Sequence, residues 1–273
     1  KMFNGDIYLK DVLLEKLKDD DFYYNKIDRF VALSASSIKD LVPPKSPRLW
    51  YYGGLKKDNE AALRAGTLFH NAILEPDKYE KLHFSNLKSR GAAGFKKQEQ
   101  EIDDVLYTDS EKQFNEVLVN AFKKNDRAMS AIKDAKFEQP LAGYISNLPF
   151  RGKCDIITSE NKIIDLKTTT KEMSDFKYTA DSFGYDVQCY VYSKLLGVDS
   201  SGFEFIVISK NSLDIGFFPV DKSFLEQGKE KFDAAVDVYK NIFWGKSKKD
   251  IENTLTQMTH QETLTAKKKY YDR

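Results

Sequence analysis

Two neighbouring stretches decide the fold of this chain: Gly152-Lys153-Cys154-Asp155-Ile156-Ile157 and Ile163-Ile164-Asp165-Leu166-Lys167-Thr168-Thr169. Both are rich in β-branched residues, and the polar residues 159–162 between them are typical of a turn, so we expect a β-hairpin. Side chains alternate along a strand, which places Asp165 and Lys167 on one face. Because hairpin pairing brings Asp155 beside Asp165, two carboxylates converge, as a site for Mg²⁺ or Mn²⁺ requires.

The elements around this hairpin predict an α/β (α+β) fold. Apolar residues with a 3.6-residue period indicate helices, most clearly over 59–74, where Pro76 ends the pattern. Further helices are expected near 37–42, 47–53, 95–106, 111–122, 127–135, 178–196 and 223–243, and strands at 137–145, 149–158, 163–168, 202–209 and 214–220. This order favours a mixed central sheet flanked by helices, with an N-terminal helical region packed on it.

The same pattern suggests the domain organisation. We expect a single catalytic domain over residues 31–245, helical over 31–136 and built around the sheet over 137–245. Residues 1–30 would form an N-terminal extension, and residues 246–273 a C-terminal basic tail or peripheral helix. No internal repeat is visible, so an array architecture is not expected.

Composition narrows the class of protein. The 273 residues carry 43 Lys and Arg against 42 Asp and Glu, a net charge of +1, which argues against a wholly basic nucleic-acid binder. No apolar run approaches the ~18 residues of a membrane span, and the first residues lack the apolar segment of a signal peptide. Two cysteines, Cys154 and Cys189, are too few for a disulfide framework and fit small core residues in a reducing, cytoplasmic setting.

Three motifs in chain order carry a family resemblance. The stretch Gly66-Thr67-Leu68-Phe69-His70-Asn71-Ala72-Ile73-Leu74-Glu75-Pro76 precedes Asp155 and Asp165-Leu166-Lys167, and Gln188 and Tyr192 follow at a Q-x-x-x-Y spacing. Together they resemble the PD-(D/E)XK nuclease superfamily, in its RecB-like branch, and most closely the RecE-type (exodeoxyribonuclease VIII-like) phage exonucleases. The proline of the superfamily name is replaced here by Cys154.

The resemblance implies a restriction-endonuclease-like fold and a metal-dependent active site. It assigns His70, Asp155, Asp165 and the main-chain carbonyl of Leu166 to one or two Mg²⁺ or Mn²⁺ ions. A metal lowers the pKa of its bound water toward about 7 and neutralises charge on the phosphate, and Lys167 would stabilise the developing charge. Catalytic roles are also implied for Gln188, Tyr192 and Glu138.

The resemblance also implies an activity and a setting. RecE-type enzymes digest linear double-stranded DNA from its ends in the 5′→3′ direction, leave 3′ single strands for a recombination partner that anneals them, and assemble as ring-like homo-oligomers. A protein of this type would be encoded by a phage or prophage and would act in the cytoplasm of the bacterial host. DNA phosphates would be contacted by basic residues outside the metal site, for which the candidates are Lys88, Arg90, Lys246, Lys248 and Lys249.

Three alternatives stay open. The first is a restriction-like endonuclease. The second is a nuclease of the CRISPR-adaptation type, although such relatives usually carry four iron–sulfur cysteines and this chain has two. The third is an inactive DNA-binding module of the same fold, against which the intact set of Asp155, Asp165, Lys167 and His70 argues.

Overall fold

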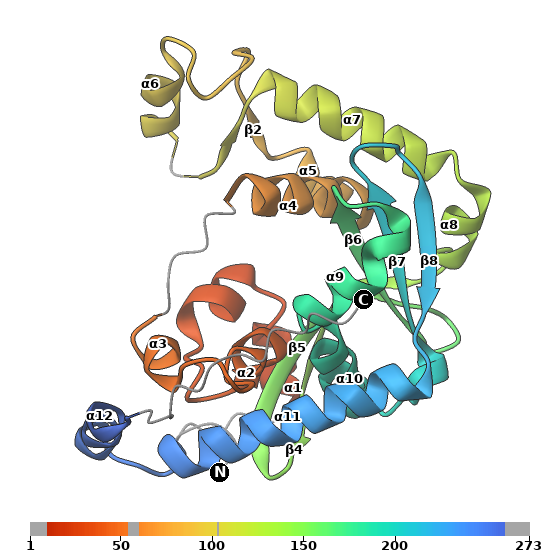
Figure 1. The fold of residues 1–273 in the computed structure, drawn as a ribbon. Coiled ribbons are helices and arrows are strands. Elements are labelled where there is room, and N and C mark those ends of the chain that lie inside the picture. The colour runs from red at the N-terminus through yellow and green to blue at the C-terminus, as the bar shows by residue number, and fades with distance from the viewer. Residues whose placement is uncertain (1–9, 54–59, 103, 260–273) are drawn as a thin grey trace, which may run out of the picture.

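A mixed β-sheet lies at the centre of the protein (Figure 1). The computed structural model describes residues 10–53, 60–102 and 104–259, and in these ranges the sheet has six strands in the order β1-β5-β6-β7-β8, with β4 paired to β5. Strand β5 is antiparallel to β4 and β6 and parallel to β1, whereas β6 and β7 are parallel. The strands are β1 (Leu33–Ser34), β4 (Lys136–Ile145), β5 (Leu148–Ile157), β6 (Ile163–Thr169), β7 (Phe203–Ser209) and β8 (Ile215–Pro219).

Helices cover both faces of the sheet and bury two large apolar cores, beside a smaller one that includes Leu13, Leu17 and Tyr23. One large core lies against α2 (Ala35–Lys39), α10 (Tyr185–Leu196) and α11 (Lys222–Ile242), and the other against α4 (Glu60–Leu74), α7 (Asp109–Lys123) and α8 (Asp126–Ala131). The predicted α/β architecture, with an N-terminal helical region on a mixed sheet, is confirmed. The remaining helices are α1 (Lys10–Lys16), a π-helix (Phe22–Lys26), α3 (Pro47–Tyr51), α5 (Pro76–Tyr79), α6 (Phe95–Gln100), α9 (Phe176–Ser182), α12 (Lys248–Gln257) and two 3₁₀ turns (Met173–Asp175 and Ser200–Gly202).

Capping residues explain where several of these helices begin. Ser34 caps α2 and Thr108 caps α7, each through a reciprocal capping box with the residue three positions later, Ser37 and Glu111. The helix predicted over 59–74 corresponds to α4. Since α4 carries His70, the start and length of this helix determine where the imidazole meets the sheet.

Two secondary-structure predictions are wrong. The single helix expected over 178–196 is two helices, because Gly184 adopts a left-handed conformation with φ 68° between α9 and α10. The helix expected over 95–106 ends at Gln100. The chain then turns, and β3 (Leu106–Tyr107) pairs with β2 (His83–Phe84) in a separate two-stranded sheet.

Helix α10 is fixed by an unusually close contact with α11. A Cβ atom at Gly228 of α11 would lie 2.1 Å from the carbonyl oxygen of Asp186, so only glycine allows this approach. The buried Asp186 carboxylate accepts hydrogen bonds from Val187 N (2.8 Å) and Gln227 Nε2 (2.8 Å) and pairs with Lys231 Nζ at 2.5 Å. This contact anchors the helix that carries Gln188 and Tyr192.

Two expectations from composition can be compared with the structure. None of the helices in the described ranges has the length and apolar character needed to cross a bilayer. Cys154 and Cys189 are free thiols buried in the core, as predicted, and burial raises the pKa of both. His260 and the Lys267–Lys269 run lie outside the described residues.

Candidate active site

The site begins where strands β5 and β6 separate. Their ladder includes only the pairs Ile156–Ile164 and Ile157–Ile163. Two residues beyond Ile164, the Leu166 amide donates to Asp155 Oδ2 at 2.9 Å, so a side chain replaces the next ladder acceptor. The predicted juxtaposition of Asp155 and Asp165 arises at this fork. Leu166 itself is fully buried in the core, on the opposite face from Asp165 and Lys167, as the strand alternation predicts.

Helix α4 brings His70 to the same fork. Its Nε2 lies 2.6 Å from the main-chain oxygen of Leu166, and its Nδ1 lies 3.7 Å from Asp155 Oδ2. The imidazole is about a quarter exposed and Asp155 less, so both reach solvent at the edge of the sheet. Three of the predicted metal ligands, His70, Asp155 and the Leu166 carbonyl, are therefore in mutual contact.

Glu138 joins this cluster through an irregularity in the sheet. The flanking pairs Phe137–Ile156 and Gln139–Cys154 place Glu138 directly opposite Asp155, and Glu138 has φ 49°. On β5, Cys154 packs in one core and Ile156 in the other, although residues two apart normally share a face. The pleat is thus interrupted at the position of Glu138 and Asp155. Such interruptions also occur where β-bulges redirect side chains beside active sites.

The donor atoms of this cluster fit a divalent cation. One ligand atom each from His70, Glu138 and Asp155 lies within 4.8 Å of the others. Burial raises the pKa of Glu138 to about 8, and the Asp155 carboxylate adds to this increase while Lys153 opposes it. Two adjacent carboxylates disfavour each other's charge, and a bound cation relieves that repulsion. Carboxylate oxygens suit Mg²⁺ or Mn²⁺, and the imidazole favours Mn²⁺.

Asp165 lies next to the cluster with both of its oxygens directed at protein groups. Gln188 Nε2 donates to Oδ1 at 2.7 Å, and Lys167 Nζ lies 2.6 Å from Oδ2. The Asp165 side chain is 1% exposed, and Oδ2 has no hydrogen bond of good geometry among the described residues. Gln188 was predicted to act near this site, and here it orients Asp165.

Lys167 is held as a cation. Burial alone would lower its pKa, but the carboxylates of Asp165 and Asp155 hold the pKa of Lys167 above its usual range. Its ammonium also lies 4.8 Å from the centre of the Tyr185 ring. Lys167 is therefore suited to stabilise negative charge and unsuited to accept a proton.

Tyr192 occupies a different environment from Gln188. The ring is almost fully buried, and a Cβ atom at Gly152 would lie 2.8 Å from it, so the tyrosine packs closely against β5. The four-residue spacing on α10 does place both residues toward the sheet. Only Gln188 makes a hydrogen bond to the residues of the fork, and the catalytic role predicted for Tyr192 stays a prediction.

Lys153 and Asp20 belong to the site but were missed by sequence reasoning. Lys153 Nζ lies 2.5 Å from Asp20 Oδ1 and 3.4 Å from Glu138 Oε2. The strand alternation around Asp155 was a usable signal for Lys153. Asp20 stands more than 130 residues away in a segment without a motif, so no local pattern indicates it.

The predicted DNA-contacting residues do not gather at the fork. The Arg90 guanidinium pairs with Glu99 (2.5 Å) and donates to the Leu106 carbonyl (2.7 Å), which fixes the loop before α6. Lys88 is exposed on the same loop. The exposed residues Lys246, Lys248 and Lys249 lie at the start of α12, far from α4 and β6 in Figure 1.

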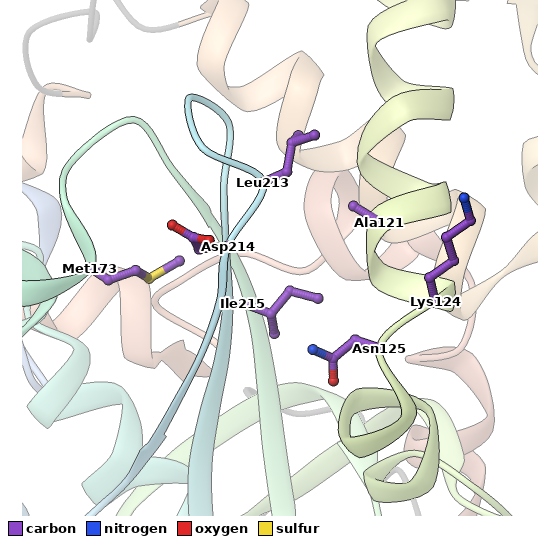
Figure 2. Close-up of a pocket in the computed structure, with 7 residues that line it drawn as sticks. All are labelled: Ala121, Lys124, Asn125, Met173, Leu213, Asp214 and Ile215. Atoms are coloured by element: carbon purple, nitrogen blue, oxygen red, sulfur yellow. The ribbon is translucent and has the colours of Figure 1, made fainter.

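A surface pocket near the β7–β8 turn is separate from these residues. Figure 2 shows its lining side chains, which come from α7 and the two residues after it, the 3₁₀ turn before α9, the β7–β8 turn and the first residue of β8. The lining residues are Ala121, Lys124, Asn125, Met173, Leu213, Asp214 and Ile215. None of these is a candidate site residue, so this pocket is separate from the acidic cluster.

A mixed sheet with Asp155 and Asp165-x-Lys167 at a strand fork defines the PD-(D/E)XK nuclease fold. Residues 34–253 match the family described as "PDDEXK-like domain of unknown function (DUF3799)". The match extends over most of the chain, and the protein therefore belongs to this family. The predicted superfamily is confirmed.

One solved structure shares this fold, and a second aligns over most of its own chain at a low TM-score. A proposed exonuclease from Eubacterium rectale aligns over 90% of this chain and 96% of its own, with a TM-score of 0.59 and 14% identity. A phage-related exonuclease from Haemophilus somnus 129PT aligns over 77% and 94%, with 18% identity and a TM-score of 0.34. No curated protein matches the chain.

Proposed function

We propose that this protein is a Mg²⁺- or Mn²⁺-dependent deoxyribonuclease that hydrolyses phosphodiester bonds of linear double-stranded DNA. The observation that carries the proposal is the convergence of His70, Glu138 and Asp155 at the fork, beside the Asp165–Lys167 pair. A bound divalent ion supplies an activated water and neutralises charge on the phosphate.

The protein's own groups take distinct roles in this proposal. His70, Glu138, Asp155 and the Leu166 carbonyl hold one or two ions, with Asp165 as a further ligand or neighbour. Lys167 contributes a fixed positive charge toward the scissile phosphate, and in a partly buried site such a charge stabilises the transition state more than it would in water. Gln188 holds the Asp165 carboxylate in place.

We further propose that the enzyme is an exonuclease acting 5′→3′ and leaving 3′ single strands for an annealing recombination protein. The support is the resemblance of the motifs to RecE-type enzymes, together with the exonuclease description of the Eubacterium rectale protein, whose fold this chain shares. A ring-like homo-oligomer around the duplex and a nuclease domain spanning residues 31–245 are part of the same proposal.

End-labelled duplexes test the activity, the polarity and the need for an end in one assay. The wild-type protein should degrade linear DNA in Mg²⁺ or Mn²⁺, release a 5′ label first and leave covalently closed circles intact. Lys167→Met, which removes the positive charge while keeping a similar side-chain length, should be inactive when the rate is normalised to the folded fraction. Cutting of closed circles would favour the endonuclease alternative, and absence of any cleavage would favour the binding module.

A further inference from the structure

The segment before β1 is attached to β5 by two neighbouring basic residues. Arg151 donates from Nη1 to the Ala32 carbonyl (2.5 Å) and from Nη2 to the Tyr23 carbonyl (3.2 Å). Lys153, two residues along the strand and on the same face, pairs with Asp20. Both β5 side chains are buried. The segment from Asp20 to Ala32 is therefore fixed against the strand that carries Asp155.

Lys153 lies between two carboxylates that belong to different parts of the chain. Its ammonium is 2.5 Å from Asp20 Oδ1 and 3.4 Å from Glu138 Oε2, and the lysine side chain is 6% exposed. The other oxygen of Asp20 pairs with Lys78 of α5, which also lies 3.2 Å from Glu75 Oε2. Asp20 thus forms ion pairs with two lysines, Lys78 and Lys153, beside the cluster.

A buried ammonium must be neutralised by a nearby anion. Without the Asp20 carboxylate, the nearest carboxyl group left to Lys153 among the described residues is that of Glu138, one of the three residues whose donor atoms converge on the candidate metal position. A tighter Lys153–Glu138 pair would occupy the carboxylate and bring a positive charge closer to a cation site. Both effects weaken metal binding.

We propose that Asp20 is a positioning residue of the metal site: it holds Lys153 and so leaves Glu138 free to bind a divalent cation. This inference rests on the proposed metal-binding function. It also gives the segment before residue 34, where the family match begins, a part in the site. Asp20 acts through Lys153 and touches neither metal nor substrate.

Mn²⁺ binding to the full chain, followed by electron paramagnetic resonance of the free ion, tests the inference independently of activity. Asp20→Asn should weaken Mn²⁺ binding about tenfold, the low end of the effect typical for residues that orient a metal ligand. Cleavage by this variant should recover at high Mn²⁺, with the maximal rate close to that of the wild type. Asp21→Asn is the matched control, since Asp21 is exposed and pairs only with the exposed Lys26 and Asn25 among the described residues. It should bind Mn²⁺ as the wild type does.

A second variant separates positioning from loss of structure. In the double variant Asp20→Asn/Lys153→Met the ammonium that would capture Glu138 is gone, so Mn²⁺ affinity should return to within about threefold of the wild type. Wild-type affinity in Asp20→Asn, or a double variant as weak as the single one, would overturn the inference. A wild-type protein that neither binds Mn²⁺ nor cleaves DNA would instead overturn the proposed function.

Discussion

Asp165 and Asp186 are both buried carboxylates paired with a lysine, yet their surroundings differ in kind. Asp186, at the crossing of α10 and α11, accepts good hydrogen bonds on both oxygens. Asp165, at the strand fork, has one oxygen without such a bond, and it neighbours the Asp155–Glu138 row, where the backbone of Glu138 is left-handed. The comparison indicates that the Asp186 carboxylate serves stability, whereas the Asp165 carboxylate, whose Oδ2 lies 2.6 Å from the Lys167 ammonium, is placed beside the candidate metal ligands.

The largest expected difference between the two carboxylates is in activity. Asp165→Asn keeps the size of the side chain but removes its charge from the site, so cleavage of linear duplex DNA in Mg²⁺ should fall at least ~10³-fold. Asp186→Asn should retain wild-type activity per folded molecule. The measurement is the initial rate of cleavage, normalised to the folded fraction from circular dichroism. Comparable losses of activity in both variants would show that the two carboxylates do not differ in function.

A smaller difference is expected in the pH dependence of stability. Burial raises the pKa of Asp165 from 3.8 to about 6, against the opposing effect of Lys167. A carboxyl with a raised pKa stabilises the folded state fully below its unfolded pKa, and this contribution is lost as pH rises through the folded pKa. The free energy of unfolding of the wild type should therefore fall relative to Asp165→Asn between pH 4 and 6.

Urea unfolding without divalent ions at several pH values measures this change, which should be on the order of 2–3 kcal/mol. Contributions of groups that do not interact with Asp165 cancel in the difference between the two proteins. A difference that stays constant across this pH range would show that Asp165 does not titrate as its burial requires.

Asp186→Asn should have the opposite signature, with stability lost and chemistry kept. The variant loses charge-assisted hydrogen bonds in a fully buried position, while Lys231 keeps Asp181 as a partner at 2.7 Å. The free energy of unfolding should fall by about 2 kcal/mol. Chemical denaturation at pH 7 tests this, with the exposed Asp233→Asn on α11 as a control that should change stability little.

The smallest effect is expected at Glu138, where function and stability should move in opposite directions. Asparagine tolerates a positive φ better than glutamate and removes a carboxyl that burial and Asp155 both disfavour. Glu138→Asn should therefore raise the free energy of unfolding by about 1 kcal/mol and weaken Mn²⁺ binding. If Glu138→Asn is instead less stable than the wild type, the positive φ of Glu138 does not destabilise the folded protein.

Sequence reasoning was sufficient for the parts of the fold that depend on local pattern. Helix α4, the capping box at Thr108 and the β5–β6 hairpin follow from periodicity, caps and turn composition, and the hairpin accounts for the nearness of Asp155 and Asp165. The place of His70 was implied by the family resemblance. The break at Gly184 was missed, because a glycine inside an apolar pattern does not reveal its backbone conformation.

The remaining features of the site depend on tertiary structure. The position of Glu138 opposite Asp155 depends on the register of β4 with β5, and the Asp20–Lys153 pair joins segments far apart in the chain. Arg90 illustrates the converse case. Its position in a basic loop indicated DNA, whereas its observed partners are Glu99 and the Leu106 carbonyl. Charge patterns alone do not distinguish these uses.

The separation of Asp20 from Lys153 has a consequence for the order of events during synthesis. The two residues are 133 positions apart. At the rate of ribosomal synthesis, roughly ten seconds therefore pass between the synthesis of Asp20 and that of Lys153 in β5. The active-site row also needs Gln188 of α10, which emerges later still. A nascent chain is therefore inert until most of it has been made, and on refolding the capacity to bind Mn²⁺ should return later than helical structure, since contacts between distant segments form slowly.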